Sequence, residues 1–215
     1  MFIFCILLIL LPFSIKINSR PRRRPRIVQF SRRFVARIGM LEIGRAFSQS
    51  SLFGSSSAVF SSCQRYRYRL DRIWDAELPP LAFGMLNPST ADHERNDPTI
   101  ERCERRARTM GFGRLIVWNL FAFRATDPKI LKKQPDPVGP DNDYFISKVL
   151  VETKKQQGKI VVGWGTHGVL LNRNSQILDI ARTLSVELYC LGITNAGQPK
   201  HPLYVPYQRE LAFWA

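Results

Sequence analysis

Short apolar runs alternate with amphipathic segments from about residue 57 to the end of the chain. Four runs are almost continuously apolar, which is typical of strands buried on both faces of a parallel sheet: residues 81–87, 114–123, 159–165 and 187–193. Three segments between them carry apolar residues at helical spacing: residues 99–110, 141–158 and 174–185. Asp97 before Pro98 marks the start of the first of these helices as its cap. This alternation predicts an α/β fold in three layers, α/β/α, with a mainly parallel four-stranded core sheet.

A hairpin precedes this core in the sequence. In residues 66–74 (YRYRLDRIW), the two tyrosines and Leu70 alternate with charged residues, which indicates a half-buried strand. Residues 58–62 form a second short run, and the polar residues 61–65 provide a turn between the two. We therefore expect an N-terminal antiparallel hairpin at an edge of the sheet.

The first 56 residues form a separate, basic extension. Residues 1–15 are apolar, but they are fewer than the roughly 20 residues that cross a bilayer, so no clear membrane span is predicted. A cluster of arginines at residues 20–26 follows. Apolar-then-basic order suits a weak membrane anchor, and the Arg-rich, acid-poor composition suits organelle targeting.

A non-native start is the third interpretation of this extension, with Met40 as the true first residue, and it is the one we favour. Residues 48–57 are rich in serine and are typical of a disordered lead-in. We therefore expect a disordered extension over residues 1–56 and a single α/β domain over residues 57–215.

The positive charge of the chain is concentrated in its N-terminal part. Of 32 Lys and Arg residues, which give a formal net charge of +15, ten lie in residues 1–56 against Glu42 as the one acidic residue there. The charge left on the domain suits DNA or a nucleotide as partner, and equally a surface that is merely soluble. The hydrophobic fraction of 45% is ordinary for a globular protein.

The cysteines and histidines do not form a metal-binding motif. The four cysteines are far apart, without a CxxC pair, and the three histidines are remote from one another. We expect no metal site, and reduced thiols in a cytoplasmic protein. Neither a Walker loop nor a G-x-G-x-x-G loop is present, so the sequence predicts no cofactor.

Polar loops follow all four expected core strands. They begin near residues 87, 124, 165 and 192. Because the carboxyl ends of parallel strands lie along one edge of a sheet, where open α/β sheets bind their ligands, we expect these loops to meet in a single site.

Three polar residues are the main candidates for this site. Asn87 precedes Pro88, which favours an extended conformation and would hold the Asn87 amide rigidly, although Asn-Pro is equally a common turn starter. Asn119 lies inside an apolar strand, where its amide needs a partner from the backbone or from a ligand. His201 lies between prolines on a polar loop, and its imidazole titrates near neutral pH.

Further candidates lie in the same loops. Asp92, Asp97 and Asp127 follow strand ends, and any of them could act as a general base; we take Asp92 as the catalytic candidate together with Asn87 and His201. The candidates for substrate binding are Ser89, Thr90, Asn119, Arg124, Trp164 and His167. The two hydroxyls among them could bind a phosphate or cap a helix.

Several unusual motifs occur in order along the domain. They are SCQRYRYRL, MLNPSTAD, NDPTIERC, NLFAFRATDP, DPVGPDND, WGTHG and HPLY. Through these motifs the stretch from about Val59 to Trp214 closely resembles the domain of unknown function 1643 family, a resemblance that implies no established activity.

A more distant resemblance concerns the strand ends. The GMLNP segment at residues 84–88, Asn119, Trp164-Gly165 and His201-Pro202 are similar, in this order, to strand-end motifs of the uracil-DNA glycosylase superfamily. The resemblance implies a uracil-DNA-glycosylase-like fold. It also implies that Asn87 positions a water, Asn119 reads a base-like edge and His201 stabilises the departing anion.

The activity implied by this resemblance is hydrolysis of an N-glycosidic bond of a nucleobase, in DNA or in a nucleoside. The alternative is a non-catalytic module that binds a nucleotide or nucleic acid in the same pocket.

Overall fold

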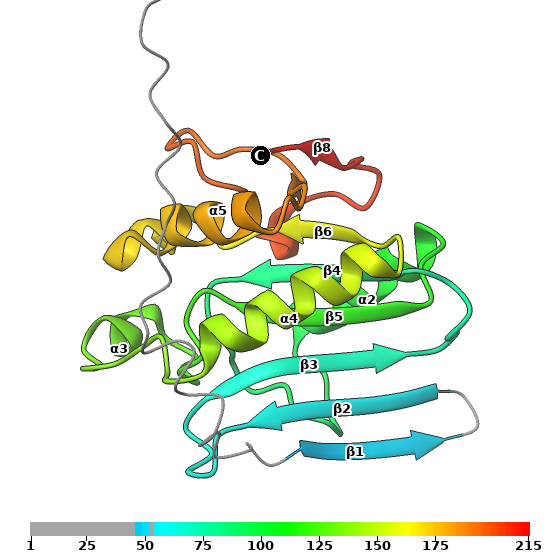
Figure 1. The fold of residues 1–215 in the computed structure, drawn as a ribbon, viewed down its shortest axis with the longest axis horizontal. Helices are drawn as coiled ribbons and strands as arrows, with labels where there is room; N and C mark the ends of the chain where they lie inside the picture. The colour runs from blue at the N-terminus through cyan, green and yellow to red at the C-terminus, as the bar shows by residue number, and fades with distance from the viewer. Residues whose placement is uncertain (1–45, 52–53) are drawn as a thin grey trace, which may run out of the picture. The chain divides into compact units, whose positions relative to one another are not determined.

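The computed structural model describes residues 46–51 and 54–215, all of which belong to one compact unit. They form a mixed α/β fold around one sheet with the strand order β1-β2-β3-β5-β4-β6-β7-β8 (Figure 1). The strands are β1 (Ala46–Ser51), β2 (Gly54–Phe60), β3 (Arg67–Ile73), β4 (Pro80–Met85), β5 (Arg114–Asn119), β6 (Lys159–Val162), β7 (Tyr189–Cys190) and β8 (Ala212–Phe213).

The four central strands, β5, β4, β6 and β7, pair in parallel, as the apolar runs predict. In Figure 1, β4 and β6 point the same way, and β3 runs in the opposite direction. Each core strand is shorter than its apolar run because the last residues of the run belong to the following loop. After β5, for example, the N–H of Phe121 donates to the carbonyl of Leu86 at 3.0 Å, so that two strand-end loops lie together.

The predicted hairpin is present, but it does not form the edge of the sheet. β2 and β3 pair antiparallel, and β3 pairs antiparallel with β5, with Leu70 opposite Val117. β1 adds a further antiparallel strand outside β2. Among the described residues, strand pairing therefore begins at Ala46, before the expected domain start at residue 57, because backbone groups of the serine-rich segment pair whatever their side chains.

Residues 1–45 lie outside the described residues. The interpretations of the N-terminal segment, including Met40 as the true start, therefore remain predictions.

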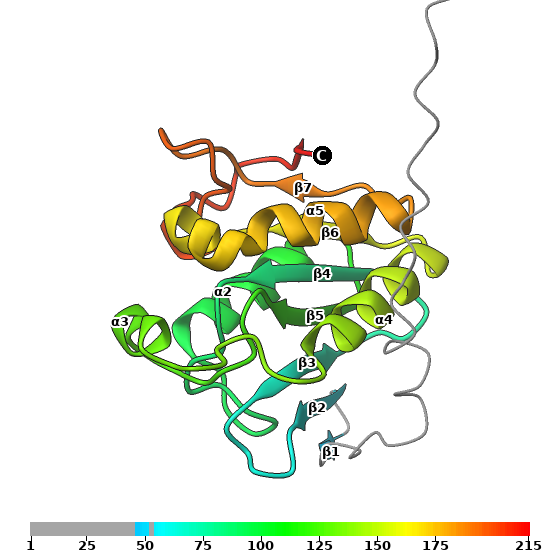
Figure 2. The same ribbon diagram turned by 60° about the vertical axis from the view of Figure 1, so that its left-hand side comes forward.

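The four helices of the described residues cover both faces of the sheet. They are α2 (Pro98–Thr109), α3 (Pro128–Lys132), α4 (Asn142–Lys155) and α5 (Arg173–Thr183). α4 and α5 pack on one face and α2 on the other, and Figure 2 shows the same arrangement after a turn of 60°. Within the described ranges, none of them is long and apolar enough to cross a membrane.

The alternation of side chains along β5 explains why the core strands are apolar throughout. Leu115 and Val117 join the cluster under α2, whereas Ile116 and Trp118 join the cluster under α4 and α5. All four side chains are fully buried. Burial of such a side chain stabilises the fold by roughly 1.5–3 kcal/mol relative to exposure.

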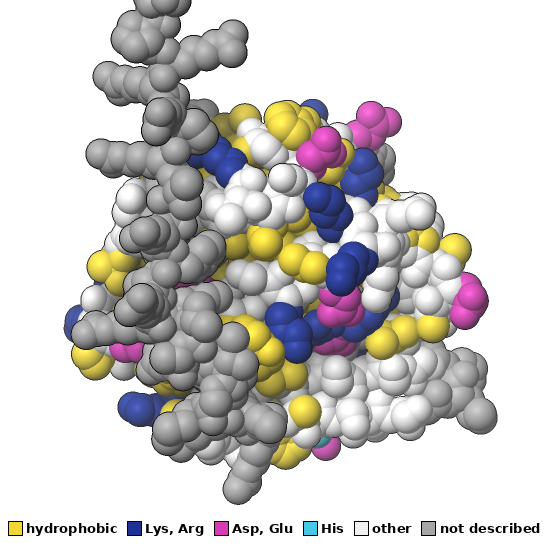
Figure 3. All heavy atoms as spheres, in the orientation of Figure 1, with side chains coloured by type: hydrophobic (Ala, Val, Ile, Leu, Met, Phe, Trp, Pro, Cys, Tyr) yellow, Lys and Arg dark blue, Asp and Glu magenta, His cyan; other side chains and the backbone are white. Residues whose placement is uncertain are grey.

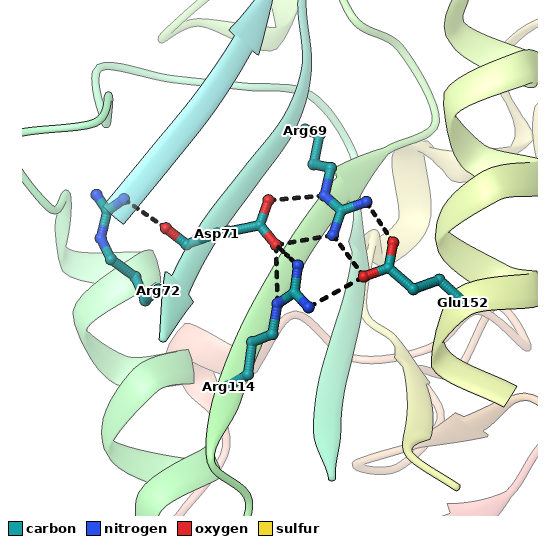
Figure 4. A network of polar contacts seen from close by, with 5 residues as sticks. All are labelled: Arg69, Asp71, Arg72, Arg114 and Glu152. Carbon is teal, nitrogen blue, oxygen red and sulfur yellow. Dashed lines mark hydrogen bonds and ion pairs between the residues drawn. The ribbon is translucent and has the colours of Figure 1, made fainter. Parts of the chain in front are cut away.

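An ion-pair network joins β3, β5 and α4 at the edge of the sheet where β5 begins (Figure 4). Asp71 accepts from Arg69 at 2.7 Å and from Arg114 at 2.6 Å. Glu152 of α4 contacts the same two arginines at 2.6 and 3.0 Å. The hydrogen bond from Arg69 is the main cause that lowers the pKa of Glu152. The network pairs charges that would otherwise be buried alone, so it has a structural role.

Besides β1, the helix α3 and the strand β8 were not expected from the sequence. α3 forms in the proline-containing loop after β5, where Oδ1 of Asp127 accepts from the N–H of Lys129 at 2.8 Å. β8 forms in the C-terminal tail and pairs with β7. Beside it, the ring of Trp214 packs edge-on against Trp164, with 5.3 Å between centroids.

Candidate functional site

A cavity of about 660 Å³ opens at the edge of the sheet where β4, β5 and β6 end. The loops after these strands and the loop after β7 all contribute to its wall, as the parallel sheet predicts. Six of the candidate residues line it: Asn87, Ser89, Asn119, Trp164, His167 and His201.

Three candidates lie elsewhere. Thr90 is exposed and does not line the cavity. Oδ1 of Asp92 accepts from the backbone N–H groups of Glu94 at 2.8 Å and Arg95 at 2.9 Å, so this carboxylate closes its own turn instead of facing the cavity. The guanidinium of Arg124 stacks over the ring of Phe60, 5.0 Å from its centroid.

Asn87 connects two strand-end loops. Its Nδ2 donates to the backbone carbonyls of Pro88 at 3.1 Å and of Ala125 at 2.6 Å. Both amide hydrogens are therefore used by the protein, and its Oδ1 accepts no hydrogen bond from a described residue. The side chain is held rigidly, and its acceptor is the group that remains available at the cavity.

Asn119 is the last residue of β5, and its side-chain amide has no hydrogen-bond partner among the described residues. The residue is 1% exposed, lines the cavity, and its buried Nδ2 makes no hydrogen bond. A buried amide donor without a partner costs roughly 1–3 kcal/mol. The backbone carbonyl of Asn119 is satisfied, because it accepts from Nδ2 of Asn142 at 3.1 Å. The sequence predicted that this amide would pair either with the backbone or with a ligand, and Nδ2 does not pair with the backbone of a described residue.

Trp164 forms a rigid wall after β6. Its Nε1 donates to Oε1 of Gln198 at 3.1 Å, which ties the wall to the loop after β7. Gly168 in the 3₁₀ segment η2 (Gly165–Asn172) lies so close to the indole that a Cβ there would be 2.0 Å from Cδ1 of Trp164. The GWGTHG sequence thus uses Gly168 for packing. His167, from the same segment, is exposed at the cavity wall.

His201 is held in place by its own backbone turn. Its Nδ1 accepts from the N–H of Leu203 at 3.3 Å and caps the 3₁₀ segment η3 (Pro202–Tyr204). A neutral imidazole that accepts at Nδ1 carries its proton on Nε2. Burial lowers the pKa of His201 below 6.5, and the charge of Asp97 opposes this shift. At pH 7 the residue is therefore a neutral N–H donor.

Asp97 lines the cavity in the place where Asp92 was expected. Its Oδ1 caps α2, and its other oxygen accepts no hydrogen bond from a described residue. The sequence marked Asp97 as a helix cap and as one of three possible bases, but spacing alone did not separate it from Asp92. Asp97 reaches the cavity and Asp92 does not, because α2, which Asp97 caps, packs against the strand ends.

Arg67 also lines the cavity, although no sequence pattern selected it as a candidate. It begins β3, and its backbone N–H donates to the carbonyl of Ala122 at 2.9 Å. Because β3 is antiparallel to β5, the start of β3 lies at the edge where β5 ends. One sequence signal could have identified Arg67 as a cavity residue: it is a charged residue that begins a strand running antiparallel to the parallel core.

No group of three or more His, Cys, Asp or Glu side chains that could hold a metal ion is found in the part of the chain that the structure describes. The cysteines there, Cys63, Cys103 and Cys190, are not in disulfides.

The family model described as "Protein of unknown function (DUF1643)" matches residues 67–203, more than half of the chain. The chain belongs to the DUF1643 family. The match includes every cavity residue described above, and its first residue is Arg67. Comparisons with curated proteins and with solved structures give no match.

In this DUF1643 protein the cavity combines groups with complementary hydrogen-bonding capacity. Asn119 offers a donor and an acceptor, His201 a donor, Asp97 an acceptor with negative charge, and Arg67 donors with positive charge. Its volume is within the range of roughly 300–1,000 Å³ that small-molecule sites have. The arrangement can therefore hold a small polar ligand in a defined orientation.

Proposed function

We propose that the cavity binds a ligand that carries a nucleobase, and that Asn119 reads the edge of the base. The observation that carries this proposal is the unpartnered, buried Nδ2 of Asn119 in the cavity wall. An amide presents one acceptor beside one donor, which is the pattern that pairs with the adjacent donor and acceptor of a base edge. A ligand that supplies an adjacent donor and acceptor offsets the free-energy cost of burying the Asn119 amide without a partner.

The order of the strand-end motifs supports the same proposal. Asn87, Asn119, Trp164 and His201 follow the order seen in the uracil-DNA glycosylase superfamily, and all four line one cavity. Trp164 adds an apolar surface beside the amide, which suits a flat heterocycle.

Calorimetric titration of the full chain with the common nucleobases and nucleosides tests the proposal. We expect binding of at least one base, and a loss of about tenfold to a hundredfold in affinity in Asn119→Leu, which is the effect of two hydrogen bonds. Asn195→Leu is the matched control, because Asn195 is exposed and does not line the cavity. Equal affinity in wild type and Asn119→Leu for every base would contradict the proposal.

Hydrolysis of an N-glycosidic bond is the second candidate function. It is favoured by the presence of the Asp97 carboxylate and the neutral His201 imidazole in one cavity. A water oriented by Oδ1 of Asn87 would attack C1′ of the sugar while the bond from C1′ to the base nitrogen breaks. The water proton would pass to Asp97, and Nε2–H of His201 would stabilise the base as it departs with the bonding electrons.

Chromatographic detection of free base tests this second function on nucleosides, nucleotides and uracil-containing DNA. If it holds, Asp97→Asn and His201→Asn slow base release by about a hundredfold or more while base binding persists. Release at the wild-type rate by Asp97→Asn would eliminate Asp97 as the base. If the DUF1643 domain binds these substrates and releases no base from any of them, the alternative of a non-catalytic binding module is supported.

A further inference from the structure

Arg67 lines the cavity and carries hydrogen-bond donors that no described residue uses. The residue is 2% exposed, and its Nη1 donates to the backbone carbonyl of Ala91. Its Nε is buried without a partner, and its Nη2 donates to no described residue. Nε–H and Nη2–H point the same way from a planar guanidinium, so they form the edge that binds two oxygens of one anion.

The described residues do not neutralise this cation. No carboxylate among them forms an ion pair with Arg67, although the charge of Asp97 acts on it from a greater distance. Burial lowers the pKa of the guanidinium to about 10, which still leaves it charged at neutral pH. Lys200 adds a second cation to the cavity wall. A buried cation without a counter-ion is costly, and an anion in the cavity removes that cost.

We infer that the Nε and Nη2 edge of Arg67 binds the phosphate of the ligand, and that the ligand is a free nucleoside monophosphate. The identity of the rest of the ligand rests on the proposed function, because Asn119 reads the base of the same molecule. Both residues lie at one edge of the sheet on neighbouring strands, and both line the same cavity. One nucleotide can therefore contact Asn119 with its base and Arg67 with its phosphate.

The burial of Arg67 favours a free nucleotide over a nucleic acid strand. A phosphate reaches this guanidinium only inside the cavity, whereas the backbone phosphates of a strand are bound by cations on a surface. On the face shown in Figure 3, Asp and Glu side chains lie among the Lys and Arg side chains.

Calorimetric titration of the full chain with inorganic phosphate, the four common ribonucleosides and their 5′-monophosphates tests the inference. We expect inorganic phosphate to bind, and the monophosphate of the preferred base to bind about tenfold or more tightly than its nucleoside. In Arg67→Met the two affinities become equal, and the nucleoside affinity stays at the wild-type value. Arg67→Lys recovers part of the difference, because an ammonium keeps the charge but not the planar pair of donors.

Arg72→Met is the matched control for these variants. Arg72 is another buried arginine of β3, but its guanidinium is bonded to Asn96 and to backbone carbonyls, and it does not line the cavity. It should keep the wild-type preference for the monophosphate. If Arg67→Met does not fold, competition between phosphate and the monophosphate on the wild type decides: competition supports one shared subsite, and independent binding overturns it.

The remaining outcomes separate this inference from the proposed function. Equal affinity for nucleosides and monophosphates in the wild type, or no binding of phosphate and monophosphates, overturns the phosphate subsite alone. Phosphate binding that depends on Arg67, with a base affinity that Asn119→Leu does not change, supports the subsite and overturns the proposed function. A single-stranded oligonucleotide that binds more tightly than every monophosphate overturns the assignment to a free nucleotide.

Discussion

The side-chain Nδ2 of Asn87 donates to the backbone carbonyl of Ala125 across 2.6 Å, and this bond joins the loop after β4 to the loop after β5. The same nitrogen also donates to the carbonyl of Pro88. Asn87 therefore fixes the shape of one side of the cavity before any ligand enters. A residue selected for its chemistry is thus also a structural clamp.

Replacing this amide by a carboxylate reverses its hydrogen bonding. In Asn87→Asp, an oxygen takes the place of Nδ2 and faces two carbonyl oxygens, so two bonds are lost and repulsion is added. We expect a loss of about 2–4 kcal/mol in the free energy of unfolding, measured in urea. Ser89→Ala, in the same loop, removes no hydrogen bond with a described residue and should stay within about 0.5 kcal/mol of wild type. A fully stable Asn87→Asp would show that the clamp is unimportant.

Asn119→Leu should behave in the opposite way. Because Nδ2 of Asn119 has no partner, an apolar side chain of similar size removes a desolvated donor without breaking a bond. We expect the melting temperature to stay the same or to rise while the affinity for the base falls by about tenfold to a hundredfold. A marked drop in melting temperature would indicate that the amide is satisfied within the protein.

The turn at His201 should make stability depend on pH. Burial lowers the pKa of His201, so the unfolded state takes up the proton at a higher pH than the folded state. The contribution of neutral His201 to the free energy of unfolding is complete above the pKa of histidine in the unfolded state, about 6.5. It is lost as the pH falls through the pKa of His201 in the folded state. We expect the melting temperature of the wild type to fall between pH 7 and pH 5.

His201→Asn is the variant that isolates this effect. Asn keeps a short acceptor for the N–H of Leu203 and does not titrate, so its melting temperature should fall less over the same range. Identical pH dependence in the two proteins would assign the effect to other groups.

The ion-pair network of Figure 4 should control stability without touching the ligand. Asp71→Ala leaves Arg69 and Arg114 with Glu152 as their one carboxylate, and we expect a loss of about 3–5 kcal/mol in the free energy of unfolding. Asp179→Ala breaks an exposed pair with Arg182 and should cost under about 1 kcal/mol. Ligand affinity of the folded Asp71→Ala protein should equal that of the wild type, because Asp71 does not line the cavity.

Gly84 and Trp118 should form a coupled pair. A Cβ at Gly84 would lie 2.3 Å from Cζ2 of Trp118 on the neighbouring strand. Gly84→Ala should therefore cost about 1–3 kcal/mol, and Trp118→Leu should cost less in the Gly84→Ala background than alone. Additive losses in the double variant, measured by urea unfolding, would show that the indole moves freely away.

Much of the site could be predicted from the sequence, because local patterns of apolar and polar residues indicate which strands are buried and that these strands are parallel. Continuous apolar runs separated by helices required parallel strands, and parallel strands bring their carboxyl ends to one edge. The loops that carry Asn87 and His201 could therefore be placed together, and the structure shows both residues and Asn119, which lies inside its apolar run, lining one cavity. The cap at Asp97 was likewise local, since a carboxylate before Pro98 begins a helix.

The choice between Asp92 and Asp97 depended on tertiary structure. Both residues follow β4 and are five residues apart. This separation does not show which carboxylate reaches the cavity, because that depends on the conformation of the loop. The turn that Asp92 closes directs its carboxylate to Glu94 and Arg95, and only the docking of α2 brings Asp97 to the cavity.

The sequence by itself determined the parallel core, the helices α2, α4 and α5 and the edge at which polar groups gather, because burial periodicity is a local property of the chain. The partner strands β1 and β8, the clamp from Asn87 to Ala125 and the place of Arg67 were decided by tertiary structure alone. Arg67 alternates with tyrosines as a solvated residue would, yet β3 lies antiparallel to β5 and is covered on both sides. Whether an arginine meets water or a ligand depends on which segments pack around it, and these are distant in the sequence.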